Sequence, residues 1–292
     1  MEQESTLYIQ GRWGPKGLPF TTRTHLKALP TMCLLAIQYQ LVPEAPVLVA
    51  ANREEYYDRK SQGPTIQSGK PRVLGGVDLV AGGTWLGVNQ HGMLVACCNR
   101  RKLYPPMAPL SRGVLCRELL KSSSAMEAAE KGAAELAAGQ YDGVNYVCVD
   151  SRSGHIVHGG DQVEVVDLQE GLSIIANRNV NDPKDDRVAL AKRLLTLQQL
   201  DSPVKFLAVA SKVFARSPSP PGRPSIILRG KDKGTVSSTL ISLGAKPRDA
   251  IYQYAPGAPD QYKYEDYSPL LRDILSRGLR EARQKAANSQ SE

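Results

Sequence analysis

Short apolar runs dominate the pattern of the chain from residue 33 onward. Cys33–Tyr39 and Val47–Ala51 are two such runs, and the prolines of Val42-Pro-Glu-Ala-Pro46 enforce a turn between them. Runs of this length, bounded by turn residues, predict buried strands. Further strands are predicted at Val77–Ala81, Thr84–Val88, Met93–Cys97, Val144–Val149, His155–His158, Val163–Val166, Ser173–Ala176, Ser237–Ser242 and Ala250–Tyr254.

Apolar residues at helical spacing interrupt these strands in two pairs. The segments with this pattern are Ser111–Leu120, Ala125–Ala138, Arg187–Leu197 and Val204–Phe214. Ser123 or Ser124 is available to cap the second of these helices. A polar helix rich in Arg, Lys and Ala is predicted from about Pro269 to the end of the chain.

The order of the elements predicts the fold class. Strands that follow one another through tight turns indicate antiparallel pairing, and helix pairs between strand blocks indicate a layered α/β (α+β) fold. Four layers, with two mainly antiparallel sheets between helices, accommodate all these elements, although composition alone does not choose this αββα sandwich over another α+β fold. Residues 1–31 mix Gly, Pro, Thr and basic residues without periodicity. They are predicted to be a disordered leader or extension, and residues 32–292 a single domain.

Composition and charge exclude several classes of function. The net charge is +8, but the basic residues are scattered, with one short cluster at Arg100-Arg101-Lys102. Only three Phe and two Trp are present to stack on bases, so nucleic acid is not the predicted partner. No apolar run approaches the roughly 18–20 residues of a membrane span, and residues 1–31 contain no apolar signal-peptide core. A cytoplasmic protein without stable membrane insertion is predicted.

The five cysteines do not form a disulfide framework, because their number is odd and most are far apart. The chain contains neither a C-x-x-C pair nor an H-E-x-x-H motif. His155 and His158 would point to opposite faces of one strand, so no metal and no cofactor is predicted. Four of the cysteines are assigned to the core: Cys97, Cys98, Cys116 and Cys148.

Four short segments carry a family resemblance. They are Met32-Cys33, Ala51-Asn-Arg-Glu-Glu55, Gly82-Gly-Thr-Trp-Leu-Gly-Val-Asn89 and Ala176-Asn177. Together they resemble the NRDE family, also called the transport-and-Golgi-organisation family, over most of residues 32–255. Family members open with Met-Cys and contain Asn-Arg-Asp-Glu and Gly-Gly-Thr-Trp-Leu-Gly. The departures from the family pattern are Glu54 for Asp, Cys98-Asn99 for Thr-Asn, and a segment Gly234–Thr239 that lacks the family's Arg.

A more distant resemblance suggests a mechanism. The run Gly87–Asn99 is similar to a strand pair of the choloylglycine hydrolase and penicillin acylase group of N-terminal-nucleophile (Ntn) hydrolases. This resemblance implies that Cys33 is the nucleophile and Arg53 its electrostatic partner. It also implies that Asn99 and Asn177 face the reacting carbonyl. The neighbouring residues with supporting roles are Asn52, Glu54, Glu55 and Trp85.

The chemistry of that arrangement is coherent. The α-amine of a first residue, with a pKa of about 7.7–8.0, can deprotonate a thiol whose pKa is about 8.5. The Arg53 guanidinium would favour the thiolate, and strand alternation places Glu55 rather than Glu54 on the same face. The amine exists only if Met32 is the functional start or the leader is removed, so residues 1–31 are expected to be absent from the functional chain.

Plain structural roles remain open beside the catalytic ones. Cys33 starts an apolar strand and could be a core residue, and Arg53 could simply pair with Glu55. Trp85 could be core or pocket wall. The glycines of Gly82-Gly-Thr-Trp-Leu-Gly87 fit a tight turn better than a phosphate loop, because neither their spacing nor a following Lys matches one. Asn89 is interpreted as a turn residue.

Two functions of different classes follow from the resemblances. The first is a cysteine Ntn-type amidohydrolase acting on a small acylated amide. The alternative is a non-catalytic protein that handles haem or a lipid-like ligand such as acyl-CoA, related to haem trafficking and Golgi or secretory organisation. A basic interaction module is a weaker third possibility. The sequence leaves the oligomeric state open, a homo-oligomer included.

Overall fold

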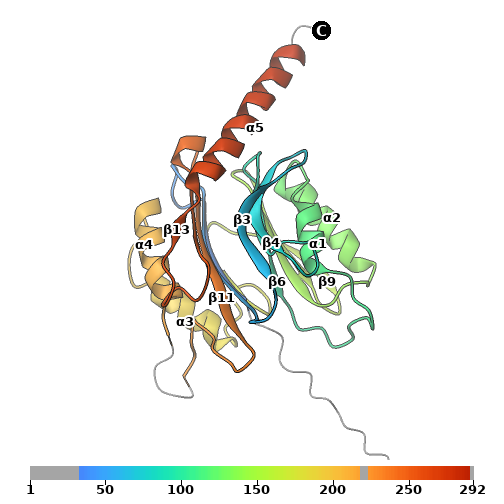
Figure 1. Ribbon diagram of the computed structural model, residues 1–292, viewed down its shortest axis with the longest axis vertical. Helices are drawn as coiled ribbons and strands as arrows, with labels where there is room; N and C mark the ends of the chain where they lie inside the picture. Colours follow the sequence, from blue (N-terminus) through green and yellow to red (C-terminus); the bar gives the residue numbers. More distant parts are fainter. Residues whose placement is uncertain (1–32, 218–222, 290–292) are drawn as a thin grey trace, which may run out of the picture.

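Two antiparallel sheets pack face to face, and helices cover the outer face of each (Figure 1). A computed structural model describes residues 33–217 and 223–289. It confirms the four-layer αββα arrangement expected from the sequence. The leader predicted for residues 1–31 lies outside the described residues, as does most of the proline-rich loop after Ser217.

The first sheet has the strand order β10-β1-β2-β11-β12-β13. Its strands are β1 (Leu34–Tyr39), β2 (Val47–Tyr56), β10 (Gly171–Ile175), β11 (Lys233–Leu243), β12 (Ile251–Ala255) and β13 (Glu265–Asp266). Alternation along β1 divides the core, because Leu35 and Ile37 face the other sheet while Leu34 and Ala36 face the helices. The covering helices are α3 (Asp186–Leu195) and α4 (Pro203–Phe214).

The second sheet runs in simple chain order from β3 to β9. Its strands are β3 (Ser61–Gln67), β4 (Val73–Asp78), β5 (Leu86–Asn89), β6 (Leu94–Asn99), β7 (Val144–Val149), β8 (Gly154–Gly159) and β9 (Val163–Asp167). Its outer face is covered by α1 (Arg112–Leu119) and α2 (Ala125–Ala137). The last helix, α5 (Ser268–Ser289), inserts Leu271 and Ile274 between the sheets, and its C-terminal end extends away from them (Figure 1).

Three strands depart from the sequence prediction, one of them the two-residue strand β13, which was not expected. β3 was not expected because it is polar and contains Gly63 and Pro64, and it is tolerated because it is a half-exposed edge strand with a register shift. β4 begins at Val73, and the predicted strand Val77–Ala81 covers only its end and the following turn. The cause is Gly75, where a Cβ would lie 2.7 Å from the Leu86 carbonyl oxygen, so glycine here reflects close packing rather than a loop.

Serine side chains define where the helices of the second sheet begin. Ser124, rather than Ser123, caps α2 by accepting a hydrogen bond from the backbone N–H of Glu127 at 3.2 Å. The Glu127 carboxylate in turn accepts a hydrogen bond from the backbone N–H of Ser123, the residue before the cap. Ser111 caps α1 in the same way. Among the described residues no helix combines the length and the apolar character that crossing a membrane requires.

Candidate active site

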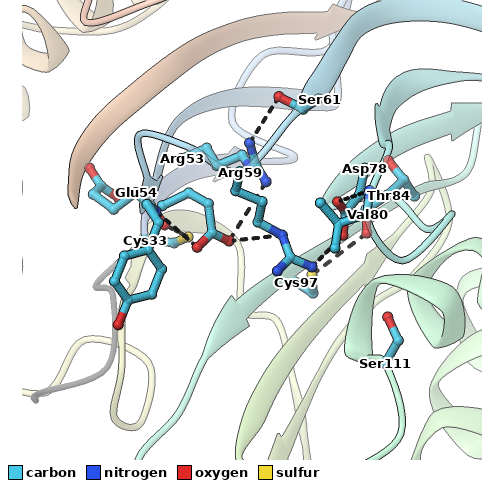
Figure 2. Close-up of polar contacts among 12 residues, drawn as sticks. Cys33, Arg53, Glu54, Arg59, Ser61, Asp78, Val80, Thr84, Cys97 and Ser111 are labelled. Carbon is cyan, nitrogen blue, oxygen red and sulfur yellow. Dashed lines mark hydrogen bonds and ion pairs between the residues drawn. The ribbon is translucent and has the colours of Figure 1, made fainter. Parts of the chain in front are cut away.

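A cavity of about 420 Å³ opens at the end of the sandwich where β1 begins and β6 ends. Both sheets and the first turn of α1 contribute to its wall. Figure 2 shows Cys33, Arg53 and Glu54 on one side, Asp78, Thr84 and Cys97 on the other, and Arg59 between them. The residues discussed below that line it are Cys33, Arg53, Glu54, Glu55, Arg59, Asp78, Trp85, Cys97, Asn99, Ser111 and Arg112.

The register of the first sheet brings the predicted catalytic residues together. Leu34 pairs with Asn52 across β1 and β2, so the next position outward places Arg53 opposite Cys33. Leu35 pairs with Ile175 in β10. Two positions further along this antiparallel pair, Asn177 lies opposite Cys33, on the side away from Arg53. Cys33, Arg53 and Asn99 line one cavity.

Asn177 occupies a different position from the other three. It is buried and is not among the residues that line the cavity. Its side-chain amide donates a hydrogen bond to the backbone oxygen of Asn99 at 2.9 Å. Asn177 therefore supports the strand end that carries Asn99.

Arg53 is held by three different neighbours. Its Nη2 lies 3.7 Å from Glu55 Oε2, and its Nη1 donates to Ser61 Oγ at 3.2 Å. The guanidinium carbon lies 4.2 Å from the centroid of the Trp85 ring, which is a cation–π contact. Glu55 is thus the acidic residue on the Arg53 face, as strand alternation predicts. Trp85 is a wall of the cavity and the surface on which the guanidinium rests.

The Gly-Gly-Thr-Trp-Leu-Gly segment forms the turn that presents Trp85. Gly82 has a φ of 73°, in the left-handed region that glycine tolerates best. A Cβ on Gly83 would lie 2.1 Å from the backbone carbon of Gly113, so the turn packs directly on the first turn of α1. The Thr84 N–H donates to the Gly113 oxygen at 2.9 Å. The segment is a tight turn between strands and not a phosphate loop.

Gly83→Ala is expected to lower the free energy of unfolding by about 1–3 kcal/mol, because backbone on both sides must move to admit a methyl group. The matched control is Gly63→Ala, whose Cβ would meet Tyr254 at an ordinary 3.4 Å. Urea unfolding of both variants measures the difference. Equal stability of the two variants would contradict the close packing of this turn against α1.

Asn52 and Glu54 face the helix layer, away from Arg53. The Glu54 Oε1 atom accepts hydrogen bonds from Arg187 Nη2 at 2.6 Å and from Thr235 Oγ1 at 3.0 Å. Asn52 Nδ2 donates to the Phe214 carbonyl at 3.0 Å. Both residues therefore anchor β2 to the helices behind it, and their support of the cavity is structural.

The thiol of Cys33 is protonated in this arrangement. Its Sγ lies 3.9 Å from the backbone oxygen of Glu54. Burial raises the pKa of Cys33 to about 12, the Glu54 carboxylate adds to this, and Arg53 opposes it only weakly. Arg53 acts in the expected direction and lowers the pKa of Cys33, but burial and Glu54 outweigh the guanidinium. Attack by Cys33 needs a base that removes the proton as the bond forms.

Sequence reasoning did not identify several further residues of the cavity, five of which carry polar or reactive groups discussed here. Arg59 Nη2 lies 2.6 Å from Asp78 Oδ2. Burial alone would raise the pKa of Asp78, but hydrogen bonds from Arg59 and Val80 lower it below its ordinary value. Strand β3, the turn after it and the rest of β4 separate Arg59 from Asp78, so no local pattern links them. The other three are Ser111 and Arg112 at the start of α1, and Cys97.

Cys97 corrects the assignment of four cysteines to the core. It is half-buried and lines the cavity, whereas Cys98, Cys116 and Cys148 are buried. The residue lies near the end of β6, where the sheet gives way to the open end of the sandwich. The sequence did not predict this exposure because the neighbouring residues of the strand are apolar.

Asn145 in β7 fixes the segment that carries Asn177. Its Nδ2 donates to the backbone oxygens of Ala176 and Arg178, each at 2.8 Å, which are the residues on either side of Asn177. Its Oδ1 lies 2.9 Å from Nδ1 of His158. The His158 Nε2 accepts from the Val180 N–H at 3.5 Å, so the ring is neutral with its proton on Nδ1. Four hydrogen bonds thus depend on neutral His158 and Asn145.

Acid is expected to weaken this cluster. Burial and the nearby Arg100 lower the pKa of His158 from 6.5 to about 4, so its contribution to stability is complete above pH 6.5 and is lost as the pH falls toward 4. His158→Gln, which cannot titrate, should lose less stability than the unmodified chain between pH 7 and pH 4.5. Urea unfolding across this range measures both slopes, and parallel slopes would show that His158 does not carry the effect.

Potential metal ligands do not cluster in the described part of the chain. Within residues 33–217 and 223–289, no three His, Cys, Asp or Glu side chains gather as metal ligands would.

Comparison with known proteins identifies relatives in sequence. The family model for Transport and Golgi organisation 2 matches residues 32–208. The Transport and Golgi organization 2 homolog of Mus musculus is 29% identical over 193 residues, which is 63% of this chain and 63% of that protein. The Transport and Golgi organization protein 2 homolog of Bos taurus is 26% identical over 249 residues, or 73% of this chain and 89% of that one. The match therefore spans less than two thirds of the mouse relative.

Several solved structures superpose on the chain at low similarity. The Caenorhabditis elegans ortholog of N-acylethanolamine-hydrolyzing acid amidase superposes with a TM-score of 0.46 at 13% identity, covering 72% of this chain and 92% of that one. A mutant of conjugated bile acid hydrolase from Clostridium perfringens gives 0.44 at 12% identity, with 82% and 93% covered. Penicillin V acylase from Agrobacterium tumefaciens gives 0.44 at 12% identity, with 77% and 82% covered.

Proposed function

The chain belongs to the Transport and Golgi organisation 2 family, and within that family we propose that it hydrolyses the amide bond of a small acylated amide with Cys33 as nucleophile. One observation carries the proposal. A cavity of about 420 Å³ has Cys33, Arg53 and Asn99 in its wall, and these residues can supply a nucleophile, a positive charge and an amide donor for acyl transfer through a thioester.

The base in this proposal is the α-amine of Cys33. No histidine lies among the described residues that line the cavity, and the Glu54 carboxylate is bound to Arg187 behind β2. An α-amine has a pKa of about 7.7–8.0 and is covalently attached to the nucleophilic residue. The proposal therefore requires a chain that begins at Cys33, since an amide nitrogen cannot accept the proton.

The reaction follows from these groups. The amine takes the thiol proton while Sγ attacks the substrate carbonyl, and the negative charge moves to the carbonyl oxygen. The Asn99 amide donates a hydrogen bond to that oxygen, and Arg53 lowers the energy of the anionic state through its positive charge. The ammonium then gives its proton to the leaving nitrogen, which leaves a Cys33 thioester. Water attacks the thioester by the same route and releases the carboxylic acid.

The charged lining of the cavity favours a substrate that has a polar group at one end. Arg53, Arg59 and Arg112 contribute positive charge to the wall, and Glu55, Asp78 and Asp142 contribute negative charge. The volume of about 420 Å³ lies within the range of about 300–1,000 Å³ typical of small-molecule sites. An amide with a short acyl group and a polar amine portion fits this lining.

The test compares the chain beginning at Cys33 with the chain of residues 1–292 on a panel of N-acyl amides of graded acyl length. Amine release is measured at pH 7.5. Hydrolysis by the shorter chain alone is the expected result. Equal hydrolysis by both chains would remove the α-amine from the mechanism. No hydrolysis of any member by either chain would contradict the proposed activity.

A binding role for haem or a long-chain acyl-CoA is the second candidate. It rests on the same cavity of about 420 Å³, which can hold a ligand without any reaction at Cys33. Titration of the chain of residues 1–292 with each compound tests it. Saturable binding supports a carrier, and a linear, non-saturating signal excludes one.

A further inference from the structure

One thiol of the cavity has no part in the proposed hydrolysis. Cys97 is half-buried in the cavity wall on β6, across from Cys33 (Figure 2). Because side chains alternate along β6, Cys98 faces the other sheet while Cys97 faces the layer of α1. Cys97 therefore lies where the cavity meets the helix layer.

A second thiol lies beside it. Cys116 on α1 is fully buried, and its Sγ donates to the backbone oxygen of Val95 on the same face of β6, at 3.9 Å. Cys97 packs against the buried cluster to which Cys116 belongs. The Cys97 Sγ lies 3.9 Å from the Thr84 oxygen. A cavity-facing thiol and a buried one are thus neighbours where α1 packs on β6.

The surroundings of Cys97 favour its ionised form. The neighbouring Cys116 thiol lowers the pKa of Cys97 below its ordinary value against the effect of burial, and the guanidinium groups of Arg112 and Arg53 lower it further. Burial raises the pKa of each of the other four thiols, Cys33, Cys98, Cys116 and Cys148. Among the thiols of the chain, Cys97 combines access with thiolate character.

We propose that Cys97 is a peroxide-reactive modification site and that Cys116 is the thiol that converts the oxidised Cys97 into a disulfide. The Cys97 thiolate attacks one oxygen of hydrogen peroxide, forming the sulfenic acid and releasing hydroxide. The Cys116 thiol then attacks the sulfenic sulfur, forming the Cys97–Cys116 disulfide and releasing water. Hydrogen peroxide is the oxidant and the two cysteines are oxidised by two electrons in total.

This inference does not depend on the proposed hydrolysis. Neither Cys97 nor Cys116 supplies a group to that reaction, and the modification needs no free α-amine. The disulfide would link β6 to α1 beside Arg112, at the wall opposite Cys33. Oxidation can therefore be measured in the chain of residues 1–292, whether or not that chain hydrolyses an amide.

The experiment treats the reduced chain of residues 1–292 with a few equivalents of hydrogen peroxide. Free thiols are then alkylated, and the non-reduced tryptic peptides are analysed by mass spectrometry. Cys97 lies in the peptide of residues 73–100 and Cys116 in that of residues 113–117. The expected product joins these two peptides, also in a Cys98→Ala variant, and dithiothreitol removes it. Oxidation confined to Cys33 or Cys98, with Cys97 still alkylated, would overturn the proposal.

Two variants separate the roles of the thiols. In Cys116→Ser, dimedone should label Cys97, because the sulfenic acid has no partner. In Cys97→Ser, the linked peptide and the label at residues 73–100 should both disappear. A maleimide at pH 7 should modify Cys97 of the unoxidised chain about tenfold faster than any other cysteine. Slower labelling of Cys97 than of Cys33 would overturn the proposal even if a variant failed to fold.

Discussion

Cys33→Ala, made in a chain that begins at residue 33, is expected to reduce amide hydrolysis by at least about 10³-fold. The alanine chain keeps its α-amine, Arg53 and Asn99 but has no nucleophile to form the thioester. Steady-state rates of amine release, measured at pH 7.5 for both chains, give the ratio. The stability of the variant should change little, because Cys33 lies at the beginning of a strand and is half-buried.

The control for this comparison is Cys148→Ala. Cys148 is fully buried in β7 and does not line the cavity. This variant should retain the rate of the unmodified chain, because it removes a thiol without touching the site. A Cys33→Ala chain that hydrolysed amides as fast as the Cys148→Ala chain would show that another group attacks the substrate.

Arg187→Met is expected to lower the free energy of unfolding by about 3–5 kcal/mol. Arg187 and Glu54 form an ion pair at 2.6 Å, and their side chains are 4% and 1% exposed. Removal of the guanidinium leaves the Glu54 carboxylate in the core without its counter-charge. The Ile226 oxygen, which accepts from Arg187 at 2.5 Å, also loses its partner. Urea unfolding at pH 7 measures the loss.

The double variant Glu54→Leu/Arg187→Met serves as the control, because it removes both charges together. It should recover much of the stability lost in the single variant, since two apolar side chains leave no unpaired charge in the core. A single variant that lost less than about 1 kcal/mol would show that the pair contributes little. A double variant as unstable as the single one would assign the loss to packing.

The layered fold could be predicted because it depends on local patterns. Short apolar runs bounded by turn residues gave most strands, and helical spacing gave both helix pairs. Alternation along β2 correctly separated Glu55, beside Arg53, from Glu54. The Gly82–Gly87 turn followed from its spacing. In each case the residues that decide the structure lie within a few positions of one another.

The features that sequence reasoning missed depend on distant residues. Glu54 and Arg187 lie 133 positions apart, and neither position carries a local sign of burial. The start of β4 was predicted too late in the chain because Gly75 interrupts its apolar run. Glycine is needed there because a Cβ would collide with the Leu86 carbonyl oxygen of the next strand. Cys97 was assigned to the core because its strand is apolar, although the strand end lies at the cavity.

The protonation state of the Cys33 thiol also depends on the assembled structure and could not be predicted from neighbouring residues in the sequence. The neighbouring Arg53 alone predicts a thiolate, but burial and the carboxylate of Glu54 have the larger effect in the opposite direction. These two contributions become visible only when the strands are assembled. They also explain why the proposed mechanism relies on proton transfer during the attack and not on a thiolate formed beforehand.

The most direct test of the central proposal is to trap the acylated protein. The chain beginning at Cys33 is mixed with an N-acyl amide that it hydrolyses, quenched in acid within the first turnover, and digested for mass spectrometry. We predict an acyl group on the Cys33 sulfur that hydroxylamine removes, and none in the Cys33→Ala chain. An acyl group on another side chain, or hydrolysis in which no acylated protein forms, would contradict the assignment of Cys33 as the nucleophile.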